Sequence, residues 1–220
     1  VLGVDQFDAN LRLMGVAWGG WCALFGAVLL AARFIRVPPE REGIAVAAVN
    51  YRLSDTAIYP AQMMDSVRAL QFLRLNAARY GIDPGRAGAF GGSAGSGISQ
   101  WLAYRDDLAD PKSPLPMLRQ STRLQAVAPY NAQSSYDPRY IGKLMGSDKI
   151  HPALISFFGM NGPQDVSNPK FWPLFEESSA LPHLTADDPP ILVFYSQRND
   201  PLPPNSTGEQ HIHHPKFGFA

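Results

Sequence analysis

The sequence has little cysteine, no excess charge of either sign and no internal repeat. Its single cysteine, Cys22, cannot form a disulfide within the chain, so cysteine usage assigns no redox compartment. Lysine and arginine (19 together) balance aspartate and glutamate (19 together), which argues against nucleic acid as a partner. Apolar residues make up 45% of the chain, enough to bury one substantial core. We therefore expect a single domain over residues 1–220, and the start at Val1 rather than Met suggests a fragment or a processed form.

A long uncharged run covers residues 13–32. Its length lies in the range of a membrane span, about 17–25 residues, and basic residues on both sides give little orientation bias. The same run also fits a buried strand over residues 13–18, a Gly-Gly turn and a buried helix over residues 23–34. We favour the strand–turn–helix interpretation and keep the membrane span as the alternative.

The most informative segment is Gly91-Gly92-Ser93-Ala94-Gly95, which matches G-x-S-x-G between a short apolar run and a helix-compatible stretch. A serine on a sharp strand-to-helix turn is held in a strained backbone conformation that exposes its hydroxyl. Glycines two positions before and after it remove Cβ atoms that would collide where strand and helix cross. The amide of Ala94, at the start of the helix, would stabilise a developing oxyanion. The spacing therefore predicts that Ser93 is a nucleophile.

A glycine-rich phosphate loop is the alternative for this segment. A Walker loop requires a lysine before its serine or threonine, and none is present here. A dinucleotide fingerprint requires an acidic residue at the end of a second strand about 20 residues on. Asp106, Asp107 and Asp110 do not end an obvious strand. The nucleophile interpretation is the better one.

Apolar runs and helical periodicity alternate along the chain. Strands are predicted over residues 43–52, 124–129 and 191–196, with another directly before Ser93, and a helix is predicted over residues 59–80. This alternation indicates an α/β fold, with a mostly parallel sheet and flanking helices.

Residues 130–190 are irregular and rich in proline, with a short helical piece near residues 151–158. Such an insertion commonly forms a lid or a pocket wall. Its aromatic residues could line an acyl pocket, although core packing is favoured: Phe157, Phe158, Phe171, Trp172 and Phe175. His151 and His183 are assigned to packing or capping.

Several blocks between Gly43 and Trp101 follow one another in a specific order and spacing. They are Asn50-Tyr51-Arg52-Leu53-Ser54, Tyr59-Pro60-Ala61-Gln62, Asp65, Leu73-Arg74, Ala77-Ala78-Arg79-Tyr80-Gly81-Ile82-Asp83-Pro84, Arg86 and the G-x-S-x-G segment. Together they resemble the α/β-hydrolase superfamily, and within it the esterase/lipase branch of hormone-sensitive-lipase-like and feruloyl-esterase-like enzymes. The resemblance implies hydrolysis of a small-molecule carboxylic ester by a Ser–Asp–His triad, without a cofactor or metal.

By this resemblance Ser93 is the nucleophile and Asp200, on the loop after residues 191–196, is the acid. The histidine would follow one more helix and strand, roughly 25–40 residues beyond the acid, and so lies past Ala220. We therefore expect a partial α/β-hydrolase fold without its last strand and helix, and a chain with low esterase turnover. A non-catalytic, hydrolase-like binding module is the alternative function.

The histidines near the end of the chain are weaker candidates. His213 or His214 is a possible substitute for the missing base. A metal site formed by His211, His213 and His214 with Glu209 is disfavoured, because no second group of ligands at metal-site spacing supports it.

The oxyanion loop departs from the family pattern. The family carries His-Gly-Gly before the Asn-Tyr-Arg block, whereas this chain has Trp18-Gly19-Gly20-Trp21. Backbone N–H groups rather than the imidazole form the oxyanion hole. Gly19 and Gly20 therefore remain the expected donors opposite Ala94.

Overall fold

The computed structural model describes residues 43–218. By its own contacts the chain divides into two units, Val1–Ala48 and Val49–Ala220. Residues 43–48, the described end of the first unit, are exposed and contain neither helix nor strand. The run over residues 13–32 lies outside the described residues, and so a single domain stays a prediction. Within the described part of the chain, no helix has the length and apolar character needed to cross a membrane.

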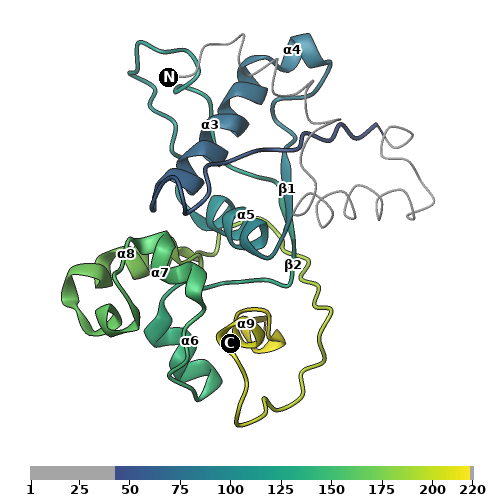
Figure 1. Ribbon diagram of the computed structural model, residues 1–220. Coiled ribbons are helices and arrows are strands. Elements are labelled where there is room, and N and C mark those ends of the chain that lie inside the picture. The colour runs from purple at the N-terminus through teal and green to yellow at the C-terminus, as the bar shows by residue number, and fades with distance from the viewer. Residues whose placement is uncertain (1–42, 219–220) are drawn as a thin grey trace, which may run out of the picture. The chain divides into compact units, whose positions relative to one another are not determined.

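A parallel β–α–β arrangement forms the centre of the second unit. Strand β1 (Gly88–Gly92) pairs in parallel with β2 (Ala126–Tyr130), with Gly88 opposite Ala126. Helix α5 (Ala94–Tyr104) connects them and packs against both strands (Figure 1). Parallel strands joined by a helical crossover confirm the predicted α/β class.

The helix predicted over residues 59–80 is present as two helices. These are α3 (Ala61–Leu75) and α4 (Ala77–Tyr80), with a break at Asn76. Gly81 ends α4 in the left-handed conformation at φ 64°, which a residue without Cβ adopts readily. Helix α3 packs on α5 and buries Met63 and Val67.

The prediction of a buried strand over residues 43–52 is wrong for the described structure. These residues have no assigned helix or strand, and Ile44 and Val46 are exposed. An apolar run becomes a strand only when a neighbouring strand accepts its hydrogen bonds. Among the described residues the sheet holds β1 and β2 alone.

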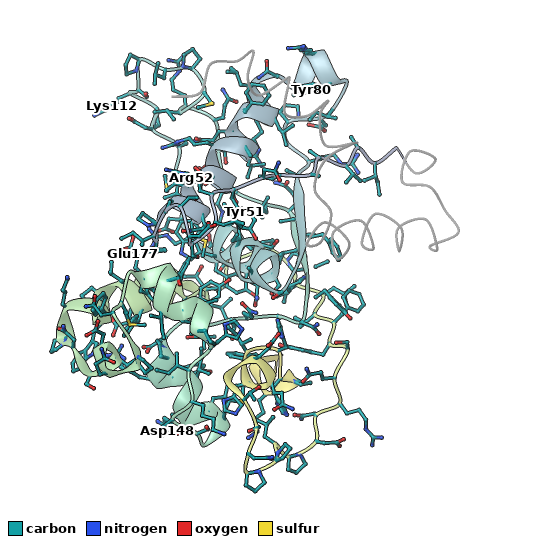
Figure 2. The ribbon with its side chains drawn as sticks, in the orientation of Figure 1. Tyr51, Arg52, Tyr80, Lys112, Asp148 and Glu177 are labelled. Atoms are coloured by element: carbon teal, nitrogen blue, oxygen red, sulfur yellow. The ribbon has the colours of Figure 1, made fainter. Side chains whose placement is uncertain are left out.

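Arg52, the last residue of that run, is held by α3. Its Nε and Nη2 donate to the two carboxylate oxygens of Asp65 at 2.9 and 2.8 Å, and its backbone N–H donates to Oδ2 at 2.9 Å. Figure 2 shows Arg52 beside the first turns of α3. A two-pronged arginine–carboxylate contact is geometrically specific, so it fixes the Asn-Tyr-Arg block against the helix.

The ion pair predicts a pH-dependent stability. Partial burial raises the pKa of Asp65, but the hydrogen bonds and charge of Arg52 outweigh it, so the pKa lies below its usual 3.8. A lowered folded-state pKa contributes stability that is present above the unfolded pKa and is lost as the pH falls through the folded one. We expect Asp65→Asn to lower Tm by a few degrees at neutral pH, and the difference to shrink below pH 3.8. Thermal melts of both proteins across that range measure this, and a constant difference would contradict it.

Residues 191–196 lie beside β2 as predicted, although not as a continuous strand. Two isolated parallel bridges join Val127 to Ile191 and Tyr130 to Phe194. Backbone hydrogen bonds of 3.0 and 3.1 Å run from Leu192 and Phe194 to β2. The carboxyl ends of three parallel segments therefore meet at one edge, where sites of α/β folds form.

The segment between β2 and residues 191–196 is largely helical. Its helices are α6 (Pro138–Met145), α7 (Pro152–Phe158) and α8 (Trp172–Ser178), with 3₁₀ turns at Pro163–Ser167, Pro169–Phe171 and Leu181–His183. Phe158 and Phe175 are buried and meet edge to face, with ring centroids 4.7 Å apart. Core packing is therefore confirmed for these two rings, whereas Trp172 is exposed. The chain then ends in helix α9 (Gly208–Ile212) and a 3₁₀ turn at Pro215–Gly218.

Candidate active site

Ser93 occupies the sharp turn between β1 and α5. Its backbone has φ 53° and ψ −119°, a conformation that non-glycine residues rarely adopt. The Ser93 N–H donates to the carbonyl of Tyr130 at 3.1 Å, and the Ser93 carbonyl accepts from the N–H of Ser96 at 2.9 Å. The turn is thus held on both sides, and Ser93 is only partly buried. The predicted strand–turn–helix geometry is present.

The two glycines of the motif play unequal parts. A Cβ on Gly91 would collide with the backbone of Gly95, so strand and helix cross closely here. A Cβ on Gly95 would meet nothing within 4 Å. The steric argument made for both glycines therefore holds for Gly91 alone. Gly95 has room for a Cβ, and its backbone is what a Cβ on Gly91 would strike.

His213 lies directly against the serine. Its Nε2 is 2.8 Å from Ser93 Oγ. The histidine caps the C-terminal end of α9, whose start is fixed by a reciprocal capping box between Thr207 and Gln210. The expectation of a histidine beyond residue 220 assumed another strand before the base. In the structure the chain reaches Ser93 through α9 without a further strand, so that expectation is not confirmed.

The surroundings of His213 favour its neutral form. Burial lowers its pKa, while the Glu209 carboxylate and a hydrogen bond to the Glu209 backbone raise it; the net pKa lies below the usual 6.5. A neutral imidazole can accept a proton at Nε2, as a general base at Ser93 requires.

Asp200 lies near the site, but its carboxylate does not reach the imidazole. Its Oδ2 is 3.3 Å from Arg198 Nε, and its side chain is 66% exposed. Its backbone carbonyl is hydrogen-bonded to Nε2 of His214 at 2.9 Å. The sequence analysis named Asp200 as the acid, and that role stays a prediction. It missed Glu209 as the carboxylate acting on His213, for which the i, i+4 spacing of the two residues was the available signal.

The other histidines have structural contacts. His211 is buried, with Nε2 2.8 Å from Ser206 Oγ, and burial lowers its pKa. His151 caps α7 by accepting from the Ala153 N–H at 3.1 Å. Across residues 43–218, no three histidine, cysteine or acidic side chains are grouped so that they could hold a metal ion.

Two hydrogen-bond donors lie close to Ser93 Oγ. The Ala94 N–H is the first of α5, so it has no acceptor within its own helix. The side-chain Nε2 of Gln133, a residue that the sequence analysis did not single out, is 3.5 Å from Ser93 Oγ. The expected donors Gly19 and Gly20 lie outside the described residues.

The comparison with protein families gives the assignment. The BD-FAE family model matches residues 39–211, most of the chain. The chain belongs to the BD-FAE family. This confirms the resemblance to the α/β-hydrolase esterases and lipases drawn from the sequence.

Curated relatives of this BD-FAE chain include two named ester hydrolases and a deacetylase. It is 29% identical to the probable carboxylic ester hydrolase LipM of Mycobacterium tuberculosis, over 71% of this chain and 34% of LipM. It is 30% identical to esterase LipQ of the same organism, over 72% of this chain and 35% of LipQ. Rabbit (Oryctolagus cuniculus) arylacetamide deacetylase is 38% identical over 40% of this chain and 22% of that protein. The chain spans about a third of the length of LipM and LipQ.

Solved structures support the fold. An acetyl ester-xyloside bifunctional hydrolase from Caldicellulosiruptor lactoaceticus superposes with a TM-score of 0.55 at 21% identity, covering 70% of the BD-FAE chain and 50% of that one. A bifunctional GH43-CE protein of Bacteroides eggerthii gives a TM-score of 0.52 at 18% identity, covering 70% and 22%. The α/β-hydrolase fold predicted from the sequence is thereby confirmed.

Proposed function

We propose that this chain carries the reacting groups of a carboxylic ester hydrolase, with Ser93 as nucleophile and His213 as general base. The observation behind this proposal is the 2.8 Å contact between His213 Nε2 and the hydroxyl of a serine at positive φ. The names of the relatives support the substrate class. The low turnover expected from the sequence followed from a missing base; with His213 in contact with Ser93, we expect measurable turnover instead.

The reaction has two halves. Ser93 Oγ bonds to the acyl carbon, its proton passes to His213 Nε2, and the carbonyl electron pair moves to oxygen. The intermediate collapses, the bond to the alcohol oxygen breaks, and the alcohol leaves with the proton from His213. Water then attacks the acyl-serine, again losing a proton to His213. The acid is released and the Ser93 hydroxyl is restored.

Two carboxylates are candidates for the group that orients and stabilises the His213 imidazolium. The family resemblance implies Asp200, which is held beside the site through its backbone. Glu209 is an exposed residue one helical turn before His213, and its negative charge raises the pKa of His213 without a direct contact between the two side chains. We propose Glu209 for this part, and the two assignments predict different results.

We expect Glu209→Gln to move the acidic limb of the kcat/KM profile to lower pH, because it removes a charge that raises the pKa of His213. We expect Asp200→Asn to leave that limb in place and kcat/KM within about threefold, since its carboxylate is exposed and paired with Arg198. Profiles of both variants beside the wild type measure this. A loss of about 10⁴-fold in kcat/KM in Asp200→Asn would instead identify Asp200 as the acid of the triad.

Turnover of a short p-nitrophenyl ester tests the proposed function. We expect Ser93→Ala to abolish it and Ser99→Ala to retain it, because the Ser99 hydroxyl bonds back to the Gly95 carbonyl at 2.7 Å within the same helix. Turnover that survives in Ser93→Ala, or no turnover in the wild type, would contradict the proposal and favour a binding module.

A further inference from the structure

We propose that Gln133 donates a side-chain N–H to the oxyanion formed during acyl transfer, and so acts as a catalytic residue beside the Ala94 amide. This inference rests on the proposed function of Ser93. The observation behind it is the position of Gln133 Nε2, 3.5 Å from Ser93 Oγ in a side chain that is only 3% exposed.

Gln133 follows β2 at the edge where the parallel segments end. The turn that delivers it begins at Asn131, which has φ 50°. Asn131 Oδ1 accepts from the backbone N–H of Ser196 at 2.9 Å and from its hydroxyl at 3.1 Å. The turn therefore joins the carboxyl ends of β2 and of the neighbouring segment, and directs the chain past Ser93.

The segment that carries Gln133 is fixed along its length. Residues 132–137 are buried without interruption. The Ser134 carbonyl accepts from the Leu181 N–H at 2.9 Å, and the Tyr136 N–H donates to Ser179 Oγ at 2.9 Å. A donor on such a segment is held in position before the reaction begins, which is the property that makes oxyanion donors effective.

The long distance to Ser93 Oγ distinguishes an oxyanion donor from a residue that only orients the serine. A hydrogen bond of 3.5 Å to a neutral hydroxyl lies at the outer limit of useful geometry. An amide removed from water needs a better acceptor than this. A carbonyl oxygen that gains negative charge next to Oγ would supply it, and the bond would strengthen as the transition state forms.

Replacing Gln133 by methionine tests the proposal, because methionine keeps the length of the side chain and removes both N–H donors. We expect Gln133→Met to lower kcat by about 10²–10³-fold with little change in KM. Gln100→Met is the matched control. Gln100 is also 3% exposed, and its amide donates to the Ser96 carbonyl at 3.2 Å, one turn back in α5. The control should retain kcat within about threefold.

A thionoester substrate separates oxyanion stabilisation from positioning. Sulfur is a weak hydrogen-bond acceptor, so the loss in Gln133→Met should be much smaller for the thionoester than for the matching oxygen ester. Equal losses on both substrates would make Gln133 a positioning residue and overturn the proposal. If Gln133→Met does not fold, as judged by its thermal melt, Gln133→Leu gives the same comparison, because it too removes both donors and adds no charge.

The outcomes for Gln133 and for the proposed function are distinguishable. A wild-type chain without Ser93-dependent turnover contradicts the proposed function and removes the basis for a role of Gln133. A wild-type chain with such turnover, together with unchanged kcat in Gln133→Met, overturns the inference alone.

Discussion

Replacing His213 by glutamine is expected to lower kcat/KM for a p-nitrophenyl ester by about 10⁴-fold. Glutamine can still hydrogen-bond Ser93 Oγ across the 2.8 Å contact, but it cannot take the proton. The serine would then have to attack as a neutral hydroxyl, which is a weak nucleophile. Steady-state kinetics with a thermal melt on the same samples measure the effect and show that the variant is folded.

His214→Gln is the control for that variant. His214 is buried and bonds the Asp200 carbonyl rather than Ser93, so its replacement should lower Tm while kcat/KM falls less than about tenfold. A larger loss in His214→Gln than in His213→Gln would reverse the assignment.

The pH profile of the wild type provides a second check on the base. Because burial keeps the pKa of His213 below 6.5, kcat/KM should rise to its plateau through an apparent pKa below that value. Through proton linkage, the free energy of unfolding also depends on the protonation of His213 and changes with pH in the same direction as activity. Between the lowered folded pKa and 6.5 the unfolded chain binds more protons at this residue, so stability rises with pH over that interval. An acidic limb of the kcat/KM profile with an apparent pKa above 6.5 would contradict a buried base at His213.

Gly91→Ala is expected to destabilise the fold by about 3 kcal/mol and to abolish turnover. The added Cβ would collide with the backbone of Gly95, and backbone cannot move aside as a flexible side chain does. Relief requires β1 and the start of α5 to separate, which would displace Ser93 from His213. Denaturant melts give the loss of stability, and ester turnover gives the loss of function.

Gly95→Ala is the matched control two residues beyond the serine. Its Cβ would meet nothing within 4 Å, and alanine is a better helix former than glycine by about 1 kcal/mol. We expect Gly95→Ala to fold with equal or higher stability. If both alanine variants lose the same stability, close crossing at Gly91 is not what the motif requires.

The local features of the fold were predictable from the sequence because short-range sterics and periodicity determine them. The turn at Ser93 follows from glycine spacing, and the helical end at Gly81 follows from the need for a left-handed residue. The extent of the strands was less predictable. Residues 43–52 carry the composition of a buried strand, yet they have no assigned strand, since pairing depends on a partner elsewhere in the chain.

The proposed base and its proposed carboxylate partner were not predictable in the same way. The contact between Ser93 and His213 joins residues 120 positions apart, and local pattern carries no information about it. Counting elements in the family order put the histidine past residue 220, and the contact that α9 brings about between His213 and Ser93 is a tertiary feature that such counting does not capture. Gln133 was missed for the same reason: one glutamine after a strand has no signature until the turn at Asn131 brings it to the serine.

Covalent labelling by a fluorophosphonate, with the modified residue located by peptide mass spectrometry, tests most directly whether Ser93 is an activated nucleophile. We expect a single adduct on Ser93 that forms readily in the wild type and at least about 10²-fold more slowly in His213→Gln. An adduct on another serine, or labelling of Ser93 at the same rate in both proteins, would contradict the activation of Ser93 by His213.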